Sequence, residues 1–285
     1  MQLSGALELD LSGIALRLEG LSAAVERGVR RDWQAFVASG LGPPFLRCRF
    51  AGTGVDAGSA PFRPKAMRAE RAGSGARFAL PEGEAWIEAG EARIVLACAL
   101  GLREYWTAVN LLRACLAWRM ADRGGALVHS AGLVVDGRAF LLVGAPGSGK
   151  SSFAALGERA GARVLSDDLV LLDRADGAFE ALGAPFRSTH VARYGPGRWP
   201  LAAVLFPRRG SPAAWVPCRA LTARARILAN LPFVSDAALG AERSAALVDR
   251  LASDVPCLEL TFGLDPTFVE LLRRPPPRTA EVGDA

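Results

Sequence analysis

Gly144-Ala145-Pro146-Gly147-Ser148-Gly149-Lys150-Ser151 is the stretch that decides how this chain folds, because it reads G-x-x-x-x-G-K-S, the P-loop or Walker A pattern. Residues 140–143 before it form an apolar run typical of a buried strand, and residues 152–156 after it favour a helix. A strand, a glycine loop and a helix in this order aim backbone N–H groups and a helix N-terminus at one point, which favours an anion. We therefore expect Gly144 to Ser152 to hold the phosphates of a nucleoside triphosphate.

The lysine of this motif is unusual in its own sequence. Lys150 is one of two lysines in the chain, and arginine carries the positive charge elsewhere. A compact ammonium is better suited than a guanidinium to a position between phosphates. We expect Lys150 to bridge the β- and γ-phosphates of ATP and Ser151 to place its hydroxyl on Mg²⁺.

Composition sets the broad class. The chain has 285 residues, 51% of them hydrophobic, which is enough for one large core or two modest ones. Its formal charge of +5 comes without a basic run of five or six residues, so no nucleic-acid partner is indicated. Five scattered cysteines without a C-x-x-C pair predict reduced thiols, and no apolar stretch approaches the roughly 20 residues of a membrane span. These features predict a soluble, cytoplasmic protein.

The chain divides near residue 123. Before that point, strands are predicted at 6–11, 15–19, 46–50, 77–80, 84–88 and 92–98, helices at 22–39 and 103–120, and a loop at 51–75. Residues 1–123 therefore predict an α/β N-terminal domain. It has no evident catalytic constellation, and its role in binding a substrate or partner stays open.

Residues 124–274 predict a second α/β domain that contains the glycine loop. Asp136-Gly137 predicts a hairpin between strands 127–135 and 138–143, which places His129 on a strand paired with the one that feeds the loop. Further strands are predicted at 162–166, 169–173, 179–182, 202–207 and 256–262, with helices in most of the remainder. Residues 275–285, which begin Pro275-Pro276-Pro277, predict a disordered tail.

Asp167 and Asp168 follow strand 162–166, which is expected to run parallel to strand 138–143. Two carboxylates at that end of a sheet suit Mg²⁺ binding and the orientation of a nucleophile. One of them would hold the metal, and the other would accept the proton of an attacking hydroxyl. The alternative is a plain Walker B pair in a hydrolase or a switch protein.

Three elements together point to a family. His129, the loop 144–152 and Ser166-Asp167-Asp168 resemble, in order and spacing, the catalytic domain of bacterial HPr kinase/phosphorylase. The whole layout resembles the HprK-related kinase A group, with Leu127-Val128-His129-Ser130-Ala131 as its L-x-H-x-A strand. The specific likeness covers about residues 125 to 173. It implies a P-loop domain of the HPr kinase/PEP carboxykinase-like kind, ATP and Mg²⁺ as cofactors, Asp167 as catalytic base and Asp168 as metal ligand.

The resemblance also implies an acceptor. Relatives phosphorylate a serine hydroxyl of a peptide or protein, and the group's genomic company suggests a co-encoded modified peptide and its chaperone; the wider family also includes homo-oligomers. One departure matters, because the chain has no glutamate between Glu180 and Glu242, where HPr kinase carries Glu-Ile-Arg-Gly. This argues against HPr as substrate and leaves phosphorylase activity open. Arg187, Arg193 and Arg198 could contact phosphate, but a role as surface arginines is favoured.

The two histidines receive different interpretations. A lone histidine on a strand is more often structural, but the position of His129 beside the loop and the resemblance favour a catalytic role, either orienting Asp167 or contacting the γ-phosphate. His190 lies in a predicted loop and is expected to be structural.

The sequence as a whole leaves two candidate functions. One is an ATP-dependent kinase for a hydroxyl acceptor, and the other is a P-loop ATPase whose nucleotide drives a conformational or assembly change.

Overall fold

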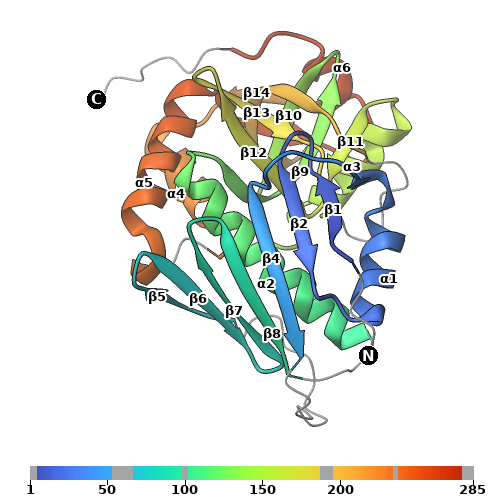
Figure 1. Cartoon of the computed structure of the whole chain (residues 1–285). Helices are drawn as coiled ribbons and strands as arrows, with labels where there is room; N and C mark the ends of the chain where they lie inside the picture. The colour runs from blue at the N-terminus through green and yellow to red at the C-terminus, as the bar shows by residue number, and fades with distance from the viewer. Residues whose placement is uncertain (1–4, 53–66, 98–101, 187–194, 234–236, 278–285) are drawn as a thin grey trace. The chain divides into compact units, whose positions relative to one another are not determined.

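The chain is described here from a computed structural model that covers residues 5–52, 67–97, 102–186, 195–233 and 237–277. It forms two compact units, Met1–Arg119 with Phe233–Ala241, and Met120–Pro232 with Glu242–Ala285. Each unit contains an eight-stranded mixed sheet and helices, which confirms the mixed α/β class (Figure 1). Within the described ranges, none of the helices has both the length and the apolar character needed to span a membrane.

The sheet of the first unit is built from short alternating strands. Its order is β3 (Val37–Ala38), β1 (Leu7–Asp10), β2 (Ala15–Glu19), β4 (Leu46–Gly52), β8 (Glu91–Leu96), β7 (Gly83–Glu88), β6 (Gly75–Leu80) and β5 (Arg68–Ala72). The pairs β2–β4 and β4–β8 are parallel, and the others are antiparallel. Alternate residues of β1 and β2, such as Leu9 and Leu16, are buried, as the period of two predicts.

Two helices accompany this sheet. Helix α1 (Ala23–Asp32) begins at Ser22, whose hydroxyl accepts a hydrogen bond from the Val25 amide. Helix α2 (Leu102–Asp122) is buried along most of its length, and the ring of Tyr105 packs against Gly28 of α1. Burial on nearly all sides explains why α2 has no clear polar face.

Two predictions for this unit were wrong. The helix predicted over 22–39 ends at Asp32, and the chain continues as a 3₁₀ turn (Gln34–Phe36) and then β3, which pairs with β1. Strand β5 lies in the predicted loop 51–75, of which 53–66 fall outside the described residues. Its sequence Arg-Ala-Glu-Arg-Ala is almost wholly exposed at a sheet edge, so no apolar alternation marked it.

The second unit is organised around β9 (Ala126–Val135). One edge of β9 pairs with β10 (Arg138–Val143), and the other edge pairs with β11 (Arg163–Ser166) and then β12 (Leu169–Ala175). The sheet continues through β13 (Ala178–Leu182), β14 (Arg198–Arg209), β16 (Cys257–Phe262) and β15 (Ala214–Pro217). Since β14 also pairs in parallel with β10, strands β10, β9, β12, β13 and β14 close into a ring.

The predicted hairpin is confirmed in this unit, because Asp136 and Gly137 both have positive φ angles, +48° and +73°, as a type I′ turn requires. Helices α3 (Lys150–Arg159) and α6 (Phe268–Leu272) share a core with the sheet, where Phe153 stacks on Phe268 at 5.0 Å between ring centroids. Helix α4 (Ala220–Leu228) also belongs to this unit, as does helix α5 (Ala237–Asp254) from Glu242 onward. Strand β15 was not predicted, because it is a four-residue exposed edge strand.

Candidate functional site

The glycine loop begins where β10 ends, at Val143. Gly147 and Gly149 have φ angles of +77° and +104°, a backbone region in which a side chain would be strained. The Ser148 amide donates to the Ala145 carbonyl at 3.1 Å and closes the turn. A Cβ on Gly144 would lie 2.6 Å from Ser148 Oγ and 3.0 Å from Pro207 Cγ, so a larger residue at 144 would displace the Ser148 hydroxyl.

Helix α3 starts directly after the loop and has an uncapped N-terminus. Its first backbone hydrogen bond joins the Phe153 amide to the Gly149 carbonyl at 2.8 Å, and no side chain caps the helix. The amides of Lys150, Ser151 and Ser152 precede that bond, and the last two residues are exposed. These amides and the helix dipole favour an anion at the start of α3.

Lys150 is buried beneath the loop, with 7% of its surface exposed. Its Nζ donates to the carbonyl oxygens of Gly144 at 2.6 Å and Ala145 at 3.1 Å. Burial lowers the pKa of the Lys150 ammonium, and the negative charge of Asp168 opposes that shift. The ammonium is therefore held against the carbonyl oxygens of the first two residues of the loop, and Asp168 is near enough to raise its pKa.

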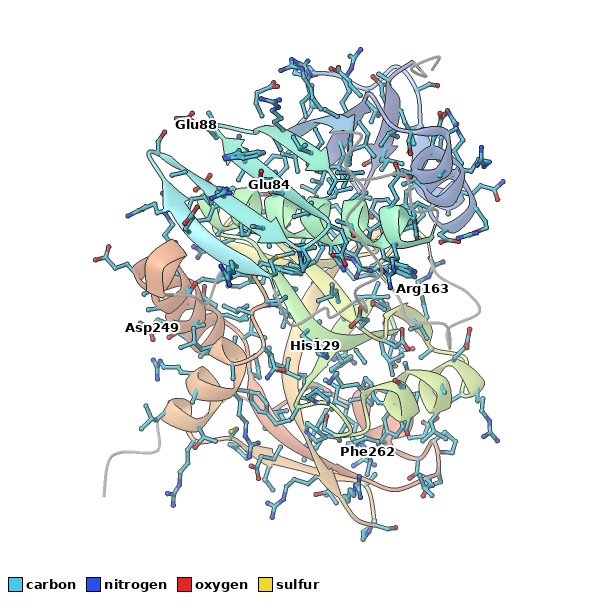
Figure 2. The ribbon with its side chains drawn as sticks, turned by 90° about the horizontal axis from the view of Figure 1, so that it is seen from below. Glu84, Glu88, His129, Arg163, Asp249 and Phe262 are labelled. Carbon is cyan, nitrogen blue, oxygen red and sulfur yellow. The ribbon has the colours of Figure 1, made fainter. Side chains whose placement is uncertain are left out.

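The register of β9 brings the other predicted residues to the same place. Ser130 of β9 pairs with Val143 on one edge, and His129 pairs with Leu169 on the other. Gly144 and Asp168 each stand one residue beyond these pairs, so the loop and Asp168 flank β9 at His129. Figure 2 labels His129 on this strand. Backbone hydrogen bonds from Ser130 to Asp168 (3.0 Å) and from His129 to Asn230 (2.8 Å) fix this arrangement.

The two aspartates occupy the short connection between β11 and β12. Ser166 shapes this connection, because its Oγ accepts from the amides of Asp168 and Leu169 at 3.1 Å each and donates to the Phe186 carbonyl. Asp167 is buried, with 4% exposed, whereas Asp168 is partly exposed. The carboxylates therefore lie in different surroundings.

Lys150 and Asp168 both affect the pKa of His129. Burial lowers its pKa, the positive charge of Lys150 lowers it further, and Asp168 acts in the opposite direction. The imidazole is therefore neutral at neutral pH, with one nitrogen as donor and the other as acceptor.

The donor set fits Mg²⁺ carried by a nucleotide. The described residues hold no group of three or more His, Cys, Asp or Glu side chains able to bind a metal by themselves. Mg²⁺ in nucleotide sites takes one or two carboxylates together with phosphate oxygens and water, which Asp167, Asp168 and the Ser151 hydroxyl could provide. Ser148 Oγ is buried without a hydrogen-bond partner among the described residues, an unsatisfied polar atom that a ligand would satisfy.

Of the three arginines considered for phosphate contact, Arg198 lies within the described residues. Arg198 pairs with the fully buried Asp173 and with Glu180, each at 2.7 Å, and so has a structural role. Arg187, Arg193 and His190 lie outside the described residues.

Arg209 at the end of β14 donates to the Gly147 carbonyl at 3.3 Å. It is 62 residues away in sequence, and only the parallel pairing of β14 with β10 brings it to the loop.

Comparisons with known proteins give little beyond this geometry. No protein-family model matches the chain, and no curated protein matches it. Among solved structures, the Hpr(Ser) kinase/phosphatase from Coxiella burnetii is a distant neighbour with 14% sequence identity and a TM-score of 0.30. The match covers 52% of this chain and 93% of that chain. At this level of similarity the neighbour decides neither the fold nor the activity.

Proposed function

We propose that this protein is an ATP-dependent kinase that transfers the γ-phosphate to the hydroxyl of a serine in a peptide or protein. The observation that carries the proposal is the register around β9, which puts the loop, Lys150, His129 and Asp168 at one end of the sheet. Phosphoryl transfer needs charge placement and alignment more than covalent chemistry.

The loop and α3 supply the phosphate contacts. Amides from Gly147 to Ser152 surround the phosphates, and Lys150 moves from the loop carbonyls to the β- and γ-phosphates. Ser151 and Asp168 hold Mg²⁺, which neutralises phosphate charge when it is bound with the nucleotide. The influence of Asp168 on both Lys150 and His129 supports its place beside the phosphates.

The buried carboxylate of Asp167 suits the role of general base. It accepts the proton of the serine hydroxyl as the new oxygen–phosphorus bond forms and the bond to the leaving ADP oxygen breaks. The neutral imidazole of His129 can orient this carboxylate or donate to the γ-phosphate. Arg209, whose guanidinium lies at the loop, can balance charge on the transferring group.

We propose that ATP and the acceptor peptide are the partners of this protein, and that it works in the cytoplasm. The four cysteines within the described residues are free and buried, and burial raises the pKa of Cys257 to about 12. Thiols of this kind suit a reducing compartment.

Label transfer tests the proposal. The full chain is incubated with Mg²⁺, γ-labelled ATP and serine peptides, including those encoded beside it, and Asp167→Asn is run in parallel. We expect a labelled peptide, and a loss of about 10²- to 10⁴-fold in Asp167→Asn with ATP binding retained. Conversion of ATP to free phosphate with no labelled peptide would instead establish an ATPase.

A further inference from the structure

A cavity of about 610 Å³ opens beside the glycine loop. It is bounded by Gly144, Ala145 and Ser148 of the loop, by the ends of β10 and β14, and by α4. Its size is within the range of small-ligand pockets, roughly 300 to 1,000 Å³.

The walls of this cavity are mainly apolar. Val143 and Phe206 line it from the sheet, and Leu221 and Ala225 line it from α4. Leu221 is 79% exposed, so this apolar part of the wall faces solvent. Among the described residues that line the cavity, Arg226 is the one with a charge; its guanidinium lies 5.3 Å from the centroid of the Phe206 ring and pairs with Glu259. The cavity therefore suits an uncharged, apolar group.

The cavity lies beside backbone carbonyls that contact Lys150 and His129. The carbonyls of Gly144 and Ala145 accept hydrogen bonds from Lys150 Nζ, and the carbonyl of Asn230, another lining residue, accepts one from the His129 amide. Lys150 and His129 belong to the reacting end of the site. Ser151 and Ser152, at the start of α3, do not line the cavity, which therefore borders the side of the loop where Lys150 and His129 make their contacts.

We propose that this cavity binds an apolar side chain of the acceptor, next to the residue whose hydroxyl is phosphorylated. The inference rests on the proposed kinase function and gives it a substrate class, a peptide with leucine, methionine or phenylalanine flanking the serine. A purine base has compatible chemistry, but the cavity borders the γ-phosphate end, where the acceptor must approach.

A serine peptide library, with each flanking position fixed in turn, tests this with labelled Mg-ATP. Ala225→Trp fills the cavity from an exposed lining position, and Ala220→Trp, exposed on the same helix but outside the lining, is the matched control. We expect the native protein and Ala220→Trp to prefer a large apolar residue over alanine at one flanking position by at least about tenfold. Ala225→Trp loses that preference, and the affinity of all three proteins for a fluorescent ATP analogue is the same.

A second measurement does not depend on turnover. A serine peptide with photo-leucine at each flanking position, bound with a non-hydrolysable ATP analogue, is expected to cross-link to residues 221–230. Equal labelling of all flanking residues would overturn the inference while leaving the kinase in place. Weaker ATP binding by Ala225→Trp with unchanged peptide preference would assign the cavity to the nucleoside. If no peptide is labelled, the kinase proposal fails, and absence of the cross-link then rejects the cavity as a peptide site as well.

Discussion

Lys150 shows why a lysine is retained in a chain otherwise rich in arginine. Its ammonium fits under the loop and reaches two carbonyl oxygens within 3.1 Å. A guanidinium is planar and larger, and it cannot act as a compact charge in that space. Lys150 is also buried, so a replacement side chain at 150 would stay in contact with the loop and could not point into solvent.

We predict that Lys150→Arg weakens ATP binding by about 10- to 100-fold, the loss of one or two charge-assisted hydrogen bonds. Arg159→Lys, on the exposed end of the same helix, is the control for arginine and lysine exchange in α3. Titration with a fluorescent ATP analogue measures both. Equal affinity in Lys150→Arg and the native chain would show that the ammonium does not contact phosphate.

The lowered pKa of His129 makes stability depend on pH in a defined direction. In the unfolded chain the imidazole regains its ordinary pKa of about 6.5. Between the folded and unfolded pKa values the unfolded chain binds more protons, so the free energy of unfolding rises with pH through that window. Acidification from neutral pH therefore destabilises the native protein, an effect that His129→Asn lacks.

Urea unfolding at about pH 5.5 and about pH 7.5 measures this difference. NMR titration of the imidazole, assigned with a His190→Gln variant, gives the midpoint directly. A midpoint above the ordinary histidine value, or the same pH dependence in His129→Asn, would contradict the burial of His129 beside Lys150.

A variant of Arg198 can distinguish a structural role of this arginine from a role in phosphate binding. It pairs with Asp173, which is fully buried and also receives a hydrogen bond from Arg123 at 2.9 Å. We predict that Arg198→Ala lowers the free energy of unfolding by roughly 1 to 3 kcal/mol, because a buried carboxylate loses a partner. ATP affinity should not change. A variant with native stability and impaired ATP binding would reverse the assignment.

At the scale of elements, the contact between α3 and β9 positions the phosphate site. Gly157 of α3 faces Leu133 of β9, which is fully buried, and a Cβ at 157 would overlap the Leu133 side chain. This close approach sets how near the helix lies to the strand that carries His129. The glycine is therefore needed for packing, although alanine is the better helix former.

We predict that Gly157→Ala destabilises the protein. Overpacking costs about 1 to 3 kcal/mol, and the helix propensity of alanine returns at most about 1 kcal/mol. Leu133→Val in the same chain should recover part of the loss, which a double-mutant cycle of urea unfolding would show. A more stable Gly157→Ala, or strictly additive effects, would mean that the helix and strand are not in this contact.

The elements also show what a sequence can and cannot predict. The hairpin of β9 and β10 was predictable because Asp136-Gly137 takes the positive φ angles that few other residue pairs accept. Strands β5 and β15 were missed because exposed edge strands have no buried alternation. The helix predicted over 22–39 was too long because Trp33 and Phe36 kept an apolar pattern although the backbone had left the helix.

At the scale of the whole molecule, the parts of the site that are close in sequence were the predictable ones. The loop and Asp167-Asp168 lie on either side of one helix, so their spacing indicated the chemistry. Arg209, Asn230 and the cavity under α4 come from later segments, and they reach the loop only through the pairing of β14 with β10 and the return of the chain after α4. Such placement has no local sequence signal.

The fate of the γ-phosphate tests the central claim most directly. The full chain is incubated with Mg-ATP and serine peptides in ¹⁸O-labelled water, and the phosphorus products are examined by mass spectrometry. A kinase places the phosphoryl group on the peptide oxygen, so we predict a phosphopeptide without ¹⁸O and little labelled inorganic phosphate. Inorganic phosphate containing ¹⁸O with no phosphopeptide would show that water is the acceptor and would contradict the assignment.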